Sequence, residues 1–175
     1  MSETLPELSS RQKTAVRVII IAALALCGVA LLLTGLGVFP CGLNLIWLPS
    51  VLFTLSFCFF AAGFIGKNPV SVWFGAAFLP PAVIGVLAGY TNLGYGQLYP
   101  LYIAAPAFAS LITGLFWLKF KPHIRAIVFF GALAGLFSLQ SSGLLGFIVV
   151  IPLVIVFVGL CAAYVAIMIR KYKNE

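Results

Sequence analysis

The stretch Lys119-Phe120-Lys121-Pro122-His123-Ile124-Arg125 is the only interior segment in which three basic residues cluster, and it separates two long apolar runs. Lys and Arg residues near the ends of membrane spans favour the cytoplasmic side of the bilayer. We therefore expect this segment to be a cytoplasmic loop. Once it is placed on that side, every other turn of the chain can be assigned to a side as well.

The composition indicates that lipid is the solvent of this chain. Of its 175 residues, 63% are hydrophobic and 7% are charged, whereas a soluble domain has roughly 25% charged residues to cover its surface. A spanning helix needs about 20 apolar residues, so one domain of this length has room for about six. The formal net charge of +7 falls in short loops and at the ends, a pattern that sets membrane orientation. We therefore expect no nucleic-acid partner.

Six apolar spans are predicted along the chain. They cover about residues 18–38, 45–66, 70–90, 99–118, 124–139 and 144–169, between cytoplasmic tails at 1–17 and 170–175. A secretory signal peptide is the rival interpretation of the first span. That run is longer than the about 7 to 15 residues of a signal core, so we expect a retained helix. The fifth span is short, at roughly 16 residues.

The distribution of charge distinguishes six spans from five. With six, all ten basic residues fall on one side, and the turns on the other side carry no charge. Five spans would place Arg170, Lys171 and Lys173 outside, against the charge rule. The predicted fold is thus an all-α, multi-pass protein of a bacterial-type cytoplasmic (cell) membrane, with both termini inside and its helices arranged as three hairpins.

A faint period accompanies the hairpins. Gly42, Gly94 and Gly146 are spaced by 52 residues, and Lys67, Lys119 and Lys171 keep the same spacing. A fixed period can indicate a repeated structural unit. Three hairpins of similar length would produce the same spacing by coincidence, and both explanations remain open.

One part of the chain has a family resemblance. The stretch Gly94-Tyr95-Gly96-Gln97-Leu98-Tyr99-Pro100-Leu101-Tyr102-Ile103 resembles the turn-aromatic-Pro-apolar entry of the LiaF-type transmembrane family, and Leu45-Ile46-Trp47-Leu48-Pro49 is a looser version. The three-hairpin plan is also similar to that of the HdeD-type acid-resistance proteins. These resemblances imply a non-enzymatic membrane protein tied to envelope stress.

Between the ends of the predicted spans there is no Asp, Glu, Lys, Arg or His residue, and Arg125 lies at the very start of the fifth span. Such residues inside a bilayer usually mark proton or ion pathways, so their absence argues against pumps, proton-coupled transport and membrane proteases. The four cysteines show no C-x-x-C spacing and have no His nearby. We therefore expect no enzyme activity, catalytic residue, metal or cofactor.

Prolines and glycines supply the candidate functional positions within the spans. Pro80 and Pro81 remove backbone donors and kink a helix, and broken helices form sites or gates in some transporters. Pro106 in the next span is expected nearby. The pairs Gly85-x-x-x-Gly89 and Gly131-x-x-x-Gly135 are typical of close helix approach. The plainer interpretations are a kink satisfied by neighbouring helices and packing within one chain.

Lys119, Lys121 and Arg125 are candidate contacts for anionic lipid, each contributing roughly 1 kcal/mol near a charged surface. Orientation alone explains these charges equally well. We expect the protein to be a non-catalytic accessory or regulatory membrane protein whose partners are the bilayer and either another membrane protein or a second copy. The alternative is a small uniporter or channel for a neutral or apolar solute, opening around Pro80 and Pro81.

Overall fold

The computed structural model describes residues 8–38, 42–90, 95–117 and 120–173, whose regular secondary structure is entirely helical. The helices are α1 (Ser10–Gly35), α2 (Leu43–Ile65), α3 (Pro69–Tyr90), α4 (Tyr95–Trp117), α5 (Phe120–Ser141) and α6 (Phe147–Lys173). All 6 contain a stretch long and apolar enough to cross a membrane. The predicted all-α fold with six helices of spanning length is confirmed.

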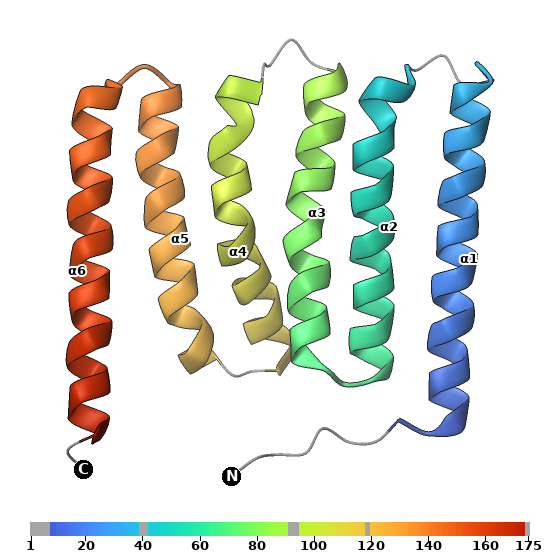
Figure 1. Cartoon of the computed structure of the whole chain (residues 1–175), viewed down its shortest axis with the longest axis horizontal. Coiled ribbons are helices and arrows are strands. Elements are labelled where there is room, and N and C mark those ends of the chain that lie inside the picture. The colour runs from blue at the N-terminus through green and yellow to red at the C-terminus, as the bar shows by residue number, and fades with distance from the viewer. Residues whose placement is uncertain (1–7, 39–41, 91–94, 118–119, 174–175) are drawn as a thin grey trace.

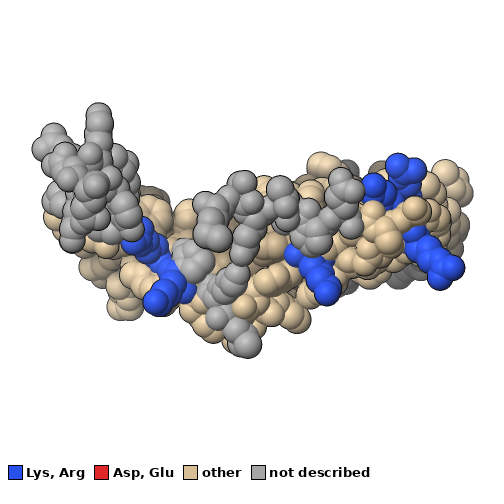
Figure 2. Space-filling model, turned by 90° about the horizontal axis from the view of Figure 1, so that it is seen from below, with Lys and Arg blue, Asp and Glu red and all other residues tan. Residues whose placement is uncertain are grey.

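The helices lie side by side in one layer, in chain order from α1 to α6 (Figure 1). Successive helices are antiparallel, so α1 begins and α6 ends at the same end of the row. Within the described residues, the backbones come close only between helices that are neighbours in the sequence, and the rings of Phe64 and Phe116 also join α2 to α4 with their centroids 4.8 Å apart. The closest contacts are between α2 and α3 and between α4 and α5, whereas α5 and α6 touch sparsely. The described helices therefore form an open row. The row is bent when it is viewed from below, along the helices (Figure 2).

The closest helix contacts do not fall within the three predicted hairpins. The predicted hairpins would pair α1 with α2, α3 with α4, and α5 with α6. The closest pairs, α2 with α3 and α4 with α5, are instead joined at the end where α1 begins. We call this end, where α6 also terminates, the basic end, and the opposite end the uncharged end.

Small side chains form the interior of the row, chiefly in α3 and α4. The fully buried positions include Ala76 and Ala82 of α3 and Ala109 of α4. Many large apolar side chains are exposed instead, for example Ile148 and Leu26. This distribution suits a lipid solvent, because lipid tails are as apolar as Leu and helices associate there through close contact of small residues.

The turn between α2 and α3 is held by its own backbone. Lys67 has a φ of 49°, in the left-handed region, and the amide of Asn68 donates to the carbonyl of Gly63 at 2.8 Å. This is the Schellman type of helix end. The Asn68 side-chain oxygen then accepts from the amide of Val70 at 3.0 Å and so caps the start of α3.

The segment predicted as a basic loop is mostly helical, which corrects the loop prediction. Helix α5 begins at Phe120 and has 22 residues, more than the roughly 16 expected for the fifth span. Pro122 is the third residue of that helix, where its missing N–H leaves no helical bond unmade. The basic residues Lys121 and Arg125 therefore stand on the first turns of a helix.

Several other boundaries also differ from the predicted ones. Ser10–Arg17 of the predicted tail already belong to α1, which Ser9 caps by accepting from the Gln12 amide at 3.3 Å. The periodic Gly42 is the N-cap of α2, and Gly146 directly precedes α6. Gly94 lies outside the described residues.

Candidate functional site: the faces and grooves of the helix row

Helices α2 and α3 are in close contact at two glycines, Gly63 of α2 and Gly75 of α3. A Cβ on Gly63 would lie 2.5 Å from Val72 Cγ2 and 2.7 Å from the Val72 backbone nitrogen. A Cβ on Gly75 would lie 2.9 Å from Phe60 Cγ. The buried hydroxyl of Ser56 donates to the Gly75 carbonyl across this contact at 2.7 Å. The contact therefore has no room for a larger residue at either glycine.

The predicted glycine pairs have different surroundings. Gly85 lies against α2, where a Cβ would come 2.8 Å from Cγ of Pro49. The side-chain environment of Gly89 is outside the described part of the chain. Around Gly131 and Gly135, an added Cβ would find no described neighbour within 4 Å. Of the described glycines in these two pairs, Gly85 lies at a helix contact within the row, and those of α5 do not.

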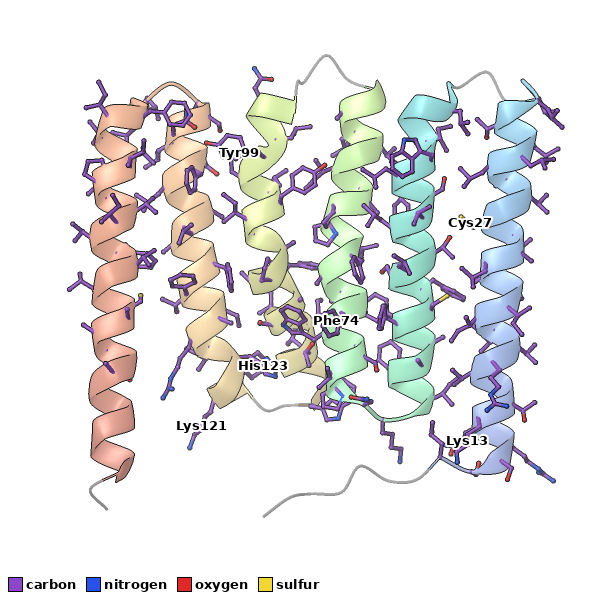
Figure 3. The ribbon with its side chains drawn as sticks, in the orientation of Figure 1. Lys13, Cys27, Phe74, Tyr99, Lys121 and His123 are labelled. Atoms are coloured by element: carbon purple, nitrogen blue, oxygen red, sulfur yellow. The ribbon has the colours of Figure 1, made fainter. Side chains whose placement is uncertain are left out.

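Two polar pairs join α4 to its neighbouring helices, one to α3 and one to α5. Trp73 of α3 donates from Nε1 to the hydroxyl of Ser110 at 3.0 Å, and Ser110 is buried. Tyr99 of α4 is half-buried near the uncharged end (Figure 3). Its hydroxyl contacts Gln140 Oε1 of α5 and lies 3.4 Å from the Phe137 carbonyl oxygen. Both aromatic residues thus connect helices, a role that their position near the ends of spans does not indicate.

The candidate prolines lie inside continuous helices. Pro80 and Pro81 belong to α3 and Pro106 to α4, and all three are half-buried. Pro80 lines an apolar groove of about 320 Å³ between α3 and α4, whose other wall includes Leu101 and Phe108. Every residue lining this groove is apolar. Its chemistry suits an acyl chain or a packed side chain rather than a polar solute.

One face of α5 is exposed along two turns and is made largely of small residues. Gly131, Ala132, Gly135 and Leu139 are all exposed and recur at the three- and four-residue spacing that places residues on one helix face. We call these four residues the open α5 face. Since small residues let two membrane helices come into close contact, this face has the shape of a helix-docking surface.

The basic end carries the described cationic side chains. Figure 2 looks onto this end and shows them spread along the row, and Figure 3 shows Lys13 and Lys121 there. The described Lys and Arg side chains are Arg11, Lys13, Arg17, Lys67, Lys121 and Arg125. Lys119, the third candidate lipid contact, lies outside the described residues, and the side chains of Arg170, Lys171 and Lys173 are likewise not described.

The described residues contain no group of three or more His, Cys, Asp or Glu side chains arranged to hold a metal ion. In the comparisons with known proteins, no protein-family model, curated protein or solved structure matches the chain.

Sequence reasoning missed two features of the structure, each of which brings residues of two helices together. The first is the Ser56–Gly75 contact, because a lone Ser in an apolar run gives no sign of which helix it faces. The second is a groove between α5 and α6, which depends on how sparsely those helices touch. The pair Gly131 and Gly135 predicted a helix contact on α5, but it gave no signal for this groove, which neither residue lines.

Proposed function

We propose that the protein is a non-catalytic accessory or regulatory protein that acts by contact between its helices and those of a membrane partner. The observation that carries this proposal is the open α5 face. Gly131 and Gly135 are exposed there, and a Cβ added to either would have no described neighbour within 4 Å. Small residues at positions that face only lipid bring no advantage, whereas opposite a second helix they permit close contact.

The proposed topology crosses a bacterial-type cytoplasmic membrane six times, as three hairpins with both termini in the cytoplasm. Its support is the charge at the two ends of the row. The described cations of α1, of the α2–α3 turn and of α5 lie at the basic end. At the uncharged end, the described connection at Ser142–Gly146 has no charged residue. Cationic residues near span ends are held on the cytoplasmic side.

Because the row is only one helix thick, we favour binding to a partner protein over transport of a solute. Apart from the ring contact of Phe64 with Phe116, which joins α2 to α4, the described helices touch only their neighbours in sequence. A solute pathway would therefore have to lie between separate copies. The groove beside Pro80 is lined by apolar residues alone and offers a hydrated solute no polar partner. By contrast, an open row presents helix faces for a partner on both of its sides.

The experiment that tests this proposal is crosslinking mass spectrometry on native membranes, with a tagged full-length chain expressed near its natural level. We expect a reproducible crosslink between the α5 region and a different membrane protein. In the variant Gly131→Leu this crosslink should be lost, because the larger side chain blocks the open α5 face. The matched control is Gly28→Leu, since Gly28 of α1 also has open space around it, and it should keep the crosslink.

Two results would overturn the proposal. Crosslinks only between copies of this chain would point to a self-contained oligomer instead of an accessory protein. The absence of any crosslink to another membrane protein would remove the partner on which the proposed function depends.

A further inference from the structure

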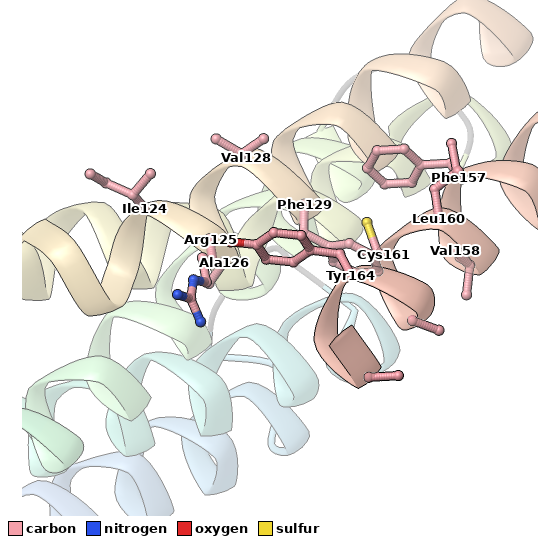
Figure 4. A pocket seen from close by; sticks show the side chains of 12 residues that line it. Ile124, Arg125, Ala126, Val128, Phe129, Phe157, Val158, Leu160, Cys161 and Tyr164 are labelled. Atoms are coloured by element: carbon pink, nitrogen blue, oxygen red, sulfur yellow. The ribbon is translucent and has the colours of Figure 1, made fainter. Parts of the chain in front are cut away.

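A large groove runs between α5 and α6 at the basic end (Figure 4). Its volume is about 970 Å³, at the upper end of the roughly 300 to 1,000 Å³ of small-molecule sites. The groove exists because α5 and α6 touch sparsely within the described residues. Along α5 it lies nearer the basic end than the open α5 face, as its α5 wall runs from Ile124 to Phe129 and that face begins at Gly131.

The wall of the groove is apolar almost throughout. Val128 and Phe129 of α5 and Leu160 and Cys161 of α6 are among the residues that line it. Toward the uncharged end, the rings of Phe129 and Phe157 stack with their centroids 5.5 Å apart. This aromatic pair joins the two helices at one end of the groove, and the apolar wall continues from it toward the basic end.

Arg125 gives the groove one cationic position. Its guanidinium carbon lies 5.9 Å from the centroid of the Tyr164 ring, within the range of a cation–π contact. Both residues line the groove near the basic end. A ring contact of this kind holds the planar guanidinium in place and leaves its N–H donors available to an anion.

No carboxylate among the described residues can pair with Arg125. The chain has three acidic residues, Glu3, Glu7 and Glu175, and all three lie outside the described ranges. Arg125 is exposed at the second turn of a membrane-spanning helix. A guanidinium at that depth is stabilised by an anionic group of the surrounding membrane interface, and phosphate matches its fork of donors in two hydrogen bonds.

We propose that the α5–α6 groove binds one anionic membrane phospholipid, with its phosphate on Arg125 and an acyl chain along the apolar wall toward Phe129 and Phe157. Among the described lining residues, a long apolar wall is combined with one cation near the basic end, which matches a lipid with a charged head and an apolar tail. A docked helix from a second copy would fill the wall but would bring no anion from its described residues. This charge complementarity selects the lipid.

The test uses the full-length protein, reconstituted in vesicles of equal parts phosphatidylglycerol and phosphatidylcholine. Native mass spectrometry then counts the phospholipids that each released protein retains. We expect retained phosphatidylglycerol in excess over phosphatidylcholine. Arg125→Gln should weaken retention of phosphatidylglycerol about fivefold, which corresponds to roughly 1 kcal/mol for one cation near an anionic surface. Arg125→Lys should keep most of it, and Lys13→Gln on α1 should change nothing.

A second pair of variants tests the groove itself without changing charge. Ala162 lines the groove, whereas its neighbour Ala163 is exposed and does not line it. Ala162→Trp should displace both the anionic and the neutral lipid, and Ala163→Trp should displace neither. Circular dichroism of each variant checks that its helix content is unchanged. Because Gly131 and Gly135 are untouched in these variants, partner crosslinks through the open α5 face should persist.

Three results would overturn the lipid site. The first is equal retention of phosphatidylglycerol by the wild type and Arg125→Gln in a helical, folded variant. The second is equal retention by Ala162→Trp and Ala163→Trp. The third is a lipid-free dimer as the main species from these vesicles, since a second copy would then occupy the groove.

Discussion

Replacing Gly75 by alanine tests whether α2 and α3 are in direct backbone contact. A methyl group there would lie 2.9 Å from Phe60 Cγ, 3.0 Å from the Phe60 backbone nitrogen and 3.0 Å from the Ser56 carbonyl oxygen. Carbon atoms in favourable contact are about 3.5 to 4.0 Å apart. Two of the three atoms are backbone, so side-chain rotation cannot relieve the clash and the helices must separate by about 0.5 to 1 Å.

The expected cost follows from two opposing effects. Overpacking a tight contact costs about 1 to 3 kcal/mol, and the separation also stretches the 2.7 Å hydrogen bond from Ser56 to the Gly75 carbonyl. Alanine in place of glycine within a helix contributes about 0.5 to 1 kcal/mol in the other direction. We therefore expect Gly75→Ala to lower the free energy of unfolding by about 1 to 2 kcal/mol.

The assay is reversible unfolding in mixed micelles, titrated with a denaturing detergent and followed by tryptophan fluorescence. Gly131→Ala is the matched control, because it makes the same change in a helix at a position surrounded by open space. The control should be neutral or slightly stabilised by the helix preference of alanine. If both variants unfolded at the same detergent fraction, the proposed close contact of α2 with α3 would be refuted.

Three further predictions concern other parts of the row. Tyr99→Phe removes the hydroxyl that contacts Gln140 and should lower the free energy of unfolding by about 0.6 kcal/mol, the average for hydrogen bonds between membrane helices; an unchanged unfolding midpoint would contradict the contact. Lys67→Gly should raise the free energy of unfolding by about 1 kcal/mol, because glycine adopts the left-handed φ of 49° without the cost that lysine incurs, and the same titration would show a loss instead if the turn were not left-handed. In a variant without native cysteines, a membrane-impermeant maleimide applied to intact cells should label Ser142→Cys at the uncharged end and spare Lys121→Cys; the reverse pattern would contradict the proposed topology.

The number of helices was predictable because it depends on simple quantities. The length of apolar runs and the positions of the ten basic residues define six spans without any knowledge of contacts. The same reasoning misplaced the boundary at Phe120, because a polar, proline-containing segment was assigned to a loop. Pro122 fits the first turn of a helix, and its basic neighbours continue α5 outward from the apolar stretch.

The arrangement of the helices was not predictable, because lipid-facing and protein-facing positions are equally apolar in this chain. In water, the polar face of a helix tells which side is buried. Here Ser56 at a buried contact and Gly131 on an open face both stand in apolar runs. The glycine pair at 131 and 135 indicated a close helix contact. It did not indicate that the described helices of the same chain leave this pair uncovered.

The groove between α5 and α6 illustrates the same limit for the candidate site. Arg125 was identified as a lipid contact from its charge alone, together with Lys119 and Lys121. Its position over the Tyr164 ring joins residues that are far apart in the sequence and depends on the register of two sparsely touching helices. No spacing in the sequence encodes that register.

Contact with a partner through the open α5 face can be tested by photocrosslinking from that face in native membranes. A diazirine-bearing amino acid replaces Leu139, which already has a large side chain and is exposed, and the control replaces Leu32, an exposed position on α1. We predict an adduct with another membrane protein from position 139 that is absent from position 32 and disappears when Gly131→Leu is added. Adducts only with a second copy of the chain, or the same adducts from both positions, would show that this face does not bind a membrane partner.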